Sequence, residues 1–423
     1  MPIRKWLYDH ALRHVGMLPG TMRPYAVPGA AALHHLRWRF DLRRTPSIPL
    51  EEHIAQTGLM EIEEGIPCDL CGERRVQPLF VAYGPERRKW RYHVVRCPAC
   101  GFLYRNPGIT PERLGDLYAK KYSRFLKGHY SDTRPRRYRL VMDAFDPVFA
   151  DGNGRRLLDF GCGTGLFLQV AHERGFETYG VDLSEDSIAE ARKHPSGANA
   201  YFGAPQDVPE IAAGGFDAVT MWSVLAHLAT PVEDLALMRR LLNDDGVLLI
   251  LTVNAGSLLL KARRGYWNGW TPNHLKVYSP HTLPRLLERA GFGAVVMRPM
   301  YGENVELGKA PMTRRQVRRF KRTVDRGNQG NMLRAVAFAD PAGPARWGMA
   351  GEAVRLAPSA SAPPRSPPTA TTAAVPRLHR ARRGERDPPR SPGFQMPGTG
   401  RGSPSRAEPS RPTGRPSRPR AGG

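Results

Sequence analysis

Four cysteines occur as two pairs with spacing that suits a metal ion. Cys68 and Cys71 are followed, after 25 residues, by Cys97 and Cys100, and a glycine comes directly after each pair. Four thiolates complete a tetrahedral zinc site, and each glycine permits a tight turn that points backbone N–H groups at the sulfurs. A site of this kind has no open coordination position, so its predicted role is structural. Disulfides or free thiols are the alternative.

Three glycines at alternate positions can bring the backbone close to a ligand. Gly161, Gly163 and Gly165 follow the strand-like residues 155–160 and precede residues 166–171, which are typical of a helix start. Glycine permits the sharp turn from strand to helix and leaves room for a ligand at the helix N-terminus. We interpret Cys162 as a small packing residue of this turn and not as a nucleophile.

Two carboxylates accompany the glycine turn. Asp182 ends the next strand-like run, 17 residues after Gly165, and Leu183 follows it. A carboxylate at the end of this second strand can accept hydrogen bonds from both ribose hydroxyls of an adenosine group. Asp159, two residues before the first glycine, can meet a cationic amino group. S-adenosylmethionine (SAM) carries such an ammonium group, so the pattern favours SAM over NAD. An N-cap or a hydrogen bond to the turn is the alternative role of Asp159.

Two histidines can act on a methyl acceptor. Methyl transfer is a displacement at a sulfonium methyl, and an oxygen or carbon acceptor usually also loses a proton. His227 follows the apolar run 216–222, at the sheet edge where α/β proteins bind ligands. We expect it to act as a general base or to orient the acceptor; holding its own loop is the alternative. His274, in the aromatic-rich loop 266–278, competes for the same role. Trp222 is predicted to line the cofactor or acceptor pocket, with a core role as the alternative.

The elements that must position these residues follow a regular pattern. Residues 155–300 alternate strand-like runs with amphipathic helices, which predicts parallel βαβ units and a Rossmann-like, seven-stranded mixed sheet in the α/β class. The predicted organisation is a basic N-terminal segment at 1–60, a zinc ribbon at 61–110, a helical connector at 111–150, the α/β domain at 151–312, a basic segment at 313–340 and a Pro/Arg-rich tail at 341–423. The tail lacks the apolar residues needed to offset chain entropy, so we predict that it is disordered. A genuine tail and a shifted reading frame are both compatible with its composition.

The net charge of +24 lies at the two ends of the chain. Residues 51–312 carry 32 basic and 31 acidic side chains, so the predicted domains are balanced. Basic ends can contact nucleic acid or an anionic membrane, but a solvated arm is the more common outcome. We therefore expect no nucleic-acid partner, and membrane contact through residues 1–50 is an open alternative. No apolar run is long enough for a transmembrane helix or a secretory signal, and the paired cysteines suit a reduced cytoplasm.

These motifs resemble the class I SAM-dependent methyltransferases over about residues 155–300. The matching segments are residues 158–165 for the SAM-binding first motif, 181–184 for the acidic second motif, 216–228 for the fourth strand and its loop, and 242–250 for the turn into the fifth strand. The cysteine region resembles the zinc-ribbon leader of a bacterial subfamily that includes sugar C-methyltransferases and other small-molecule methyltransferases. The family often has an acidic residue after the third strand, near the adenine amine. Here the resemblance assigns that contact to Asp207, to Gln206 or to backbone.

The resemblance implies a SAM-dependent methyltransferase with SAM as cofactor and structural Zn²⁺. We expect methyl transfer to an oxygen or carbon atom of a small-molecule acceptor, such as a sugar or a secondary metabolite. A zinc-ribbon protein that binds or modifies nucleic acid and a non-catalytic scaffold with the SAM fold are the alternatives. An NAD-dependent oxidoreductase is disfavoured by the glycine spacing.

Overall fold

The computed structural model describes the two predicted domains and the segment that follows them. The described residues are 30–57, 63–83, 91–109, 138–139, 142–143, 145–267, 269–271, 273–300 and 329–356. The predictions for residues 1–29, for most of the helical connector, for residues 313–328 and for the tail beyond residue 356 lie outside these ranges.

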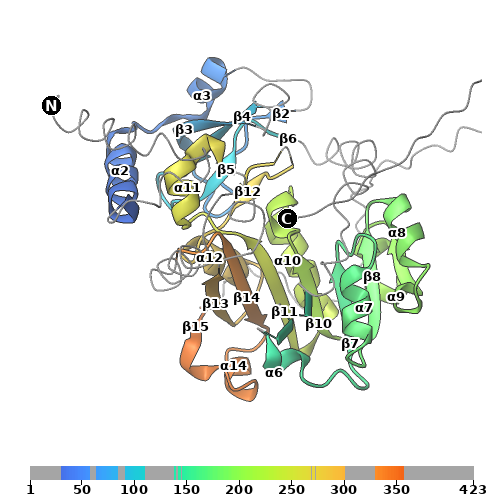
Figure 1. The fold of residues 1–423 in the computed structure, drawn as a ribbon. Coiled ribbons are helices and arrows are strands. Elements are labelled where there is room, and N and C mark those ends of the chain that lie inside the picture. Colours follow the sequence, from blue (N-terminus) through green and yellow to red (C-terminus); the bar gives the residue numbers. More distant parts are fainter. Residues whose placement is uncertain are drawn as a thin grey trace, which may run out of the picture. The chain divides into compact units, whose positions relative to one another are not determined.

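An eight-stranded mixed sheet forms the α/β domain (Figure 1). In spatial order its strands are β15 (Ala353–Arg355), β13 (Ala294–Met300), β14 (Met332–Phe338), β11 (Leu242–Val253), β10 (Phe216–Trp222), β7 (Arg156–Phe160), β8 (Glu177–Asp182) and β9 (Asn199–Phe202). The strands from β11 to β9 are parallel, while β14 runs antiparallel to both β11 and β13. The seven strands from β13 to β9 confirm the predicted Rossmann-like sheet, and β15 adds an eighth at one edge.

The sheet extends beyond residue 312, where the sequence predicts that the domain ends. Strand β14 lies in the predicted basic segment, and α14 (Gly343–Arg346) and β15 lie at the start of the predicted tail. The reason is burial: β14 is apolar at six of its seven positions and packs in the centre of the sheet, with Leu333 and Phe338 facing opposite cores. The basic composition of residues 313–340 as a whole obscures this apolar run of seven residues, so the sequence does not predict the strand.

Helices cover both faces of the sheet. On one face, α10 (Pro231–Leu241) and α12 (Thr282–Arg289) pack against apolar side chains of β10, β11 and β14. On the other face, α6 (Asp146–Phe149) and α7 (Leu166–His172) share a second core with alternate residues of the same strands. α8 (Glu185–Ala191) follows β8, and α9 (Pro209–Ala212) precedes β10. This layering places the loops after β7, β8 and β10 at one edge of the sheet.

The cysteine region forms a second, five-stranded sheet. Its order is β1 (Ile48–Pro49), β3 (Arg75–Tyr83), β4 (Arg91–Arg96), β5 (Leu103–Arg105) and β12 (Lys276–Val277). Strands β3 and β4 lie between the two cysteine pairs in sequence, within the predicted zinc ribbon. Strand β12 follows β11 in sequence, far from the cysteine pairs, and it pairs antiparallel with β5. Short strands β2 (Glu63–Glu64) and β6 (Gly108–Ile109) pair with each other, and α3 (Leu50–Thr57) follows β1.

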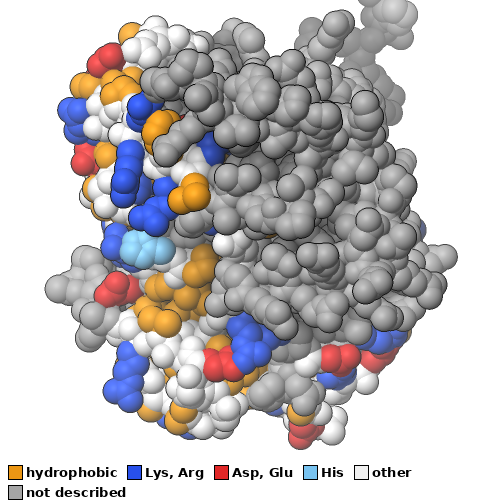
Figure 2. Space-filling view, turned by 60° about the vertical axis from the view of Figure 1, so that its left-hand side comes forward, with side chains coloured by type: hydrophobic (Ala, Val, Ile, Leu, Met, Phe, Trp, Pro, Cys, Tyr) orange, Lys and Arg blue, Asp and Glu red, His pale blue; other side chains and the backbone are white. Residues whose placement is uncertain are grey.

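Helix α2 (Ala30–Arg44) presents apolar and basic side chains to the surface. Leu36 and Phe40 are 62% and 50% exposed, and Arg39 and Arg43 are exposed beside them. Figure 2 shows basic and hydrophobic side chains next to one another on the face that carries this helix. Among the described residues, no helix combines the length and apolar character that a bilayer crossing needs. Membrane contact through residues 1–50 stays an open alternative.

Candidate functional site

The glycine turn connects β7 to α7 in a conformation that needs glycine. Gly161, Gly163 and Gly165 have φ angles of 78°, 54° and 76°, which side chains other than glycine rarely adopt. An added Cβ at Gly161 would lie 2.6 Å from Cγ2 of Val224, in the loop after β10. The turn is held to the next strand because the N–H groups of Gly161 and Cys162 both donate to the carbonyl of Val181. The loops after β7, β8 and β10 therefore meet at this turn.

Cys162 packs inward from the turn. It is 7% exposed and lies in a small apolar cluster with Leu168 and Ile188. Burial raises the pKa of its thiol well above the ordinary value, and the nearby carboxylates of Asp159 and Asp182 act in the same direction. The thiolate that a nucleophile needs is therefore disfavoured.

Asp182 lies at the carboxyl end of β8 and faces the glycine turn. Its Oδ2 accepts from the N–H of Gly163 at 2.9 Å, and its Oδ1 accepts from the N–H of Ser184 at 2.9 Å. The backbone N–H of Leu183 also faces this carboxylate, and of its roughly four lone-pair positions some remain for other donors. This geometry fits a carboxylate that receives two ribose hydroxyls while it also fixes the turn.

Asp159 is a buried carboxyl group at the end of β7. It is 2% exposed, and its Oδ1 accepts from the hydroxyl of Thr220 at 2.7 Å. Burial raises the pKa of Asp159 to about 8, with a hydrogen bond from Thr220 opposing the shift and the charge of Asp182 adding to it. In the described part of the chain, no basic side chain lowers the pKa of Asp159. A cationic ligand would supply the missing positive charge, which fits the ammonium and sulfonium groups of SAM.

The edge beyond Asp182 offers apolar contacts. Leu183 is 48% exposed directly after Asp182. Phe202 is 49% exposed at the end of β9, where it is the register partner of Asp182. Gln206 and Asp207 lie in the exposed 3-10 turn η4 (Pro205–Asp207) that follows. Sequence reasoning missed Phe202, although its place at the end of the third strand is the same signal that identified Asp182.

Trp222 ends β10 and is 8% exposed. Its ring packs against Phe167 of α7 at 4.8 Å and against Phe145 at 6.0 Å between ring centroids. The indole N–H is buried and has no hydrogen-bond partner among the described residues. Such a donor is costly to leave unsatisfied, so a ligand that accepts from it would stabilise this side of the site. The next residue, Ser223, has a φ of 62° and redirects the chain over the glycine turn.

The two histidines named from the sequence lie against each other. His227 is in the 3-10 turn η5 (Leu225–His227), and its ring centroid is 4.7 Å from that of His274. Nδ1 of His227 bonds to the carbonyl of Asn273 at 2.8 Å, and Nδ1 of His274 contacts the carbonyl of Gly269. Burial lowers the pKa of His227, and burial together with the charge of His227 lowers the pKa of His274 to about 3. Both imidazoles are therefore neutral at neutral pH.

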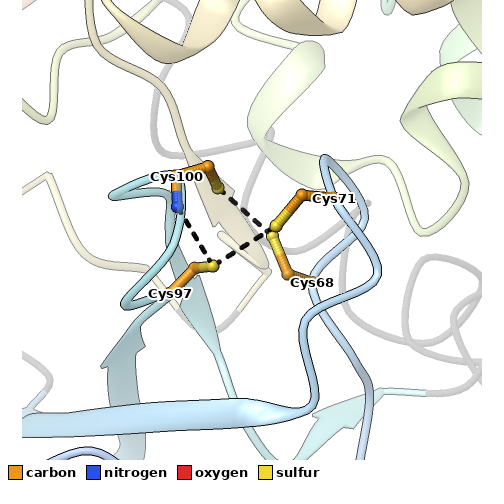
Figure 3. A group of neighbouring side chains, drawn as sticks. All are labelled: Cys68, Cys71, Cys97 and Cys100. Atoms are coloured by element: carbon orange, nitrogen blue, oxygen red, sulfur yellow. Dashed lines mark hydrogen bonds between the residues drawn. The ribbon is translucent and has the colours of Figure 1, made fainter.

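The four paired cysteines converge on one point, as Figure 3 shows. Their sulfur atoms all lie within 4.8 Å of one another, and two Sγ–Sγ pairs, Cys68–Cys100 and Cys71–Cys97, are 3.5 Å apart. Zinc–sulfur bonds of about 2.3 Å in a tetrahedron require sulfur separations of about 3.8 Å, so the cluster fits Zn²⁺ closely.

The glycine after each cysteine pair has the conformation that the turn requires. Gly72 and Gly101 have φ angles of 71° and 80°, and their N–H groups donate to the carbonyls of Cys68 and Cys97. The N–H of Cys100 points at the sulfur of Cys97 at 3.4 Å, as the sequence predicts for such knuckles.

The comparison with protein families identifies a methyltransferase domain over residues 130–296. Among curated proteins, the chain is 35% identical over 136 residues to a ubiquinone biosynthesis O-methyltransferase of Caulobacter sp. (strain K31), covering 29% of this chain and 54% of the relative. It is 28% identical over 165 residues to the protein of the same name from Idiomarina loihiensis, covering 35% of this chain and 68% of the relative. The chain thus spans about half to two thirds of the length of these relatives.

The comparison with solved structures matches a SAM-dependent methyltransferase from Archaeoglobus fulgidus. It is 24% identical, the match covers 47% of this chain and 93% of that one, and the TM-score is 0.36. A second, from Thermotoga maritima, is described as a possible histamine N-methyltransferase; it is 17% identical with a TM-score of 0.37 and covers 54% of this chain and all of that one.

Proposed function

We propose, from the premise that residues 130–296 form a SAM-dependent methyltransferase domain of the class I type, that the protein methylates a hydroxyl oxygen of a small-molecule acceptor. The observation that carries the proposal is the pair of carboxylates at the glycine turn. Asp159 is buried without a cation in the described part of the chain, and Asp182 lies at the carboxyl end of β8, where it accepts from backbone N–H groups of the turn. The choice of oxygen is supported by relatives that are O-methyltransferases by name.

In this proposal the three loops at the sheet edge hold SAM. Asp182 accepts from the ribose hydroxyls, Leu183 and Phe202 contact the adenine faces, and Asp159 faces the amino-acid part. Gln206 or Asp207, which follow Phe202 closely in sequence, accepts a hydrogen bond from the adenine amine. The bound cofactor supplies an electrophilic methyl group, and the chain's own residues hold the acceptor in line with it.

We propose that His274 contacts the acceptor hydroxyl and that His227 holds it in place. Nδ1 of His274 meets a carbonyl and must donate its proton, so Nε2 carries the lone pair. The lowered pKa keeps the ring neutral, so Nε2 can accept a hydrogen bond from a hydroxyl at neutral pH. The hydroxyl proton becomes acidic only as the oxygen gains the methyl group, so its transfer to His274 accompanies bond formation.

Replacing His274 by alanine is expected to lower kcat about 100-fold, because the proton acceptor is lost. The affinity for SAM is expected to change less than about twofold, since the proposal places the ring against the acceptor and not against the cofactor. Single-turnover kinetics with labelled SAM and calorimetry measure the two quantities. His172→Ala, at an exposed position of α7, is the matched control. An unchanged kcat in His274→Ala would remove this residue from the mechanism.

Replacing Asp182 by alanine is expected to weaken SAM binding about 100-fold, because two hydrogen bonds to a charged acceptor are lost. Calorimetry of wild type and variant gives the ratio, and Asp186→Ala, exposed in the first turn of α8, controls for loss of a carboxylate. Equal affinities of wild type and Asp182→Ala would overturn the ribose assignment. Transfer of label from SAM to a panel of phenolic, sugar and aliphatic hydroxyl compounds tests the reaction itself. Label recovered only on carbon or nitrogen would contradict O-methylation.

A further inference from the structure

A short connecting segment, residues 273–278, lies between the cysteine region and the loop that carries His227. Its strand β12 pairs with β5 of the cysteine region, with Lys276 opposite Tyr104. The backbone of Leu275 bridges both sides: its N–H donates to the carbonyl of Ala226 at 2.8 Å, and its carbonyl accepts from the N–H of Arg105 at 2.8 Å. The connecting segment is therefore hydrogen-bonded to both domains through the backbone of a single residue.

The side chain of Lys276 adds a further link. It is 1% exposed, and its Nζ lies 2.9 Å from Oδ2 of Asp69. Asp69 lies between Cys68 and Cys71, inside the first cysteine pair. The same ammonium group donates to the carbonyl of Ala229, two residues after His227. A buried ammonium loses much of its hydration, so the position of each partner depends on the others.

Both histidines depend on this segment. The carbonyl of Asn273 receives the Nδ1 bond of His227, and His274 is itself part of the segment. Just before it, the carbonyl of Thr271 accepts from the hydroxyl of Tyr92, on strand β4 of the cysteine region, at 3.0 Å. The hydrogen bonds that the glycine turn and Asp182 make to Val181 and Ser184, by contrast, stay within the α/β domain.

We propose that the metal-binding cysteine region positions the histidine pair, and that Lys276 is the positioning residue through which it does so. Metal at the four cysteines fixes Asp69, Asp69 fixes Lys276, and Lys276 fixes both the connecting segment and the loop of residues 225–229. The catalytic consequence rests on the proposed function, whereas the structural coupling does not. The hydrogen bonds that hold the glycine turn and Asp182 lie outside this path.

Hydrogen exchange measured by mass spectrometry on the full, zinc-loaded chain tests the coupling without any assay of activity. In Lys276→Met, amide exchange in residues 225–229 and 273–278 is expected to rise about tenfold, because the bonds that hold these residues open more often. Exchange in residues 156–165 and the calorimetric affinity for SAM are expected to stay within about twofold of wild type. Lys193→Met, which removes an exposed ion pair with Glu190, is the matched control.

A second variant and metal removal keep the test decisive. Lys276→Met leaves a carboxylate without its cation, so Asp69→Asn combined with Lys276→Met removes both charges and is expected to show the same local rise. Removing zinc from wild type with a chelator is expected to raise exchange in the same two segments. Unchanged exchange there after chelation, or an equal rise in the glycine turn, would overturn the proposal.

The outcomes separate this inference from the proposed function. If the variants show the local rise but wild type methylates no hydroxyl compound, the coupling stands and the proposed reaction fails. If wild type is active, Lys276→Met is expected to lower kcat at least about tenfold while the KM for SAM changes little. Full activity in a variant whose connecting segment exchanges freely would show that the link positions nothing used in catalysis.

Discussion

Serine at Cys97 is expected to abolish stoichiometric metal binding and to unfold the cysteine region. The four sulfurs form a closed set, so removing one leaves a three-ligand site that holds zinc much more weakly. Metal binding to such a small module contributes on the order of 10 kcal/mol to its folding. We therefore expect the largest stability loss of any single substitution considered for this chain. Elemental analysis after dialysis against a chelator gives the metal content, and exchange protection of residues 68–105 reports the fold.

The fifth cysteine provides the control for this experiment. Cys162 lies in the glycine turn and outside the cysteine cluster, so Cys162→Ser is expected to retain about one metal ion per chain. Retention of one zinc by Cys97→Ser, with protected amides in β4 and β5, would contradict the four-thiolate assignment. Loss of metal from both variants would point to a general effect of thiol removal.

The affinity for SAM is expected to rise with pH up to about pH 8 because of Asp159. Burial raises the pKa of this carboxyl to about 8, so below that pH the group is mostly protonated in the free protein. A cationic ligand favours the ionised form, so binding must release a proton, and the affinity rises about tenfold per pH unit between pH 6 and 8. Above about pH 8 the amino group of the ligand itself loses its proton, and the affinity falls again.

Asp159→Asn is expected to bind SAM about 1000-fold more weakly at pH 8 and to lose the rise with pH, because asparagine cannot ionise. Calorimetry at several pH values, in buffers of different ionisation enthalpy, measures both the affinity and the proton release. Asp186→Asn, exposed in α8, is the control. A parallel pH dependence in wild type and Asp159→Asn would assign the titration to another group.

The raised pKa of Asp159 also predicts that the protein without SAM becomes less stable as pH rises, whereas its affinity for SAM increases. Its pKa is about 8 when folded and about 4 when unfolded, so the unfolded chain gives up this proton first as pH rises. The contribution of Asp159 to the free energy of unfolding is therefore greatest below about pH 4 and is lost progressively as pH rises to 8. Without SAM, Asp159→Asn is expected to unfold at a temperature at least about 3 °C higher than wild type at pH 8. A lower unfolding temperature would show that the asparagine disrupts its contact with Thr220.

Local sequence signals identify those candidate site residues whose conformation depends on their neighbours in the chain. The alternating glycines of 161–165 require a turn because their φ angles suit no other residue, and Asp182 follows from the strand that comes next. The cysteine pairs are likewise readable because each pair and its glycine form a complete local turn. The Rossmann-like order of strands follows from the alternation of strand-like and helical segments.

Contacts between distant segments were not readable from the sequence. Lys276 looks like a surface lysine in an aromatic loop, and only the pairing of β12 with β5 places it 2.9 Å from Asp69. The contact between His227 and His274 joins two loops that are distant in sequence, so the sequence could name both residues but not bring them together. The end of the third strand signals Phe202 in the sequence, but only the register of β8 and β9 places it opposite Asp182.

The antiparallel strand β14 affects how this chain must be synthesised. It lies between β11 and β13, yet more than thirty residues separate it from β13 in sequence. Until Phe338 has left the ribosome, the nascent chain therefore carries two apolar strands whose facing edges have no partner. Such non-local pairing is slow and exposes the partly folded chain to aggregation. Dependence on chaperones during translation would follow directly from the position of β14 between β11 and β13.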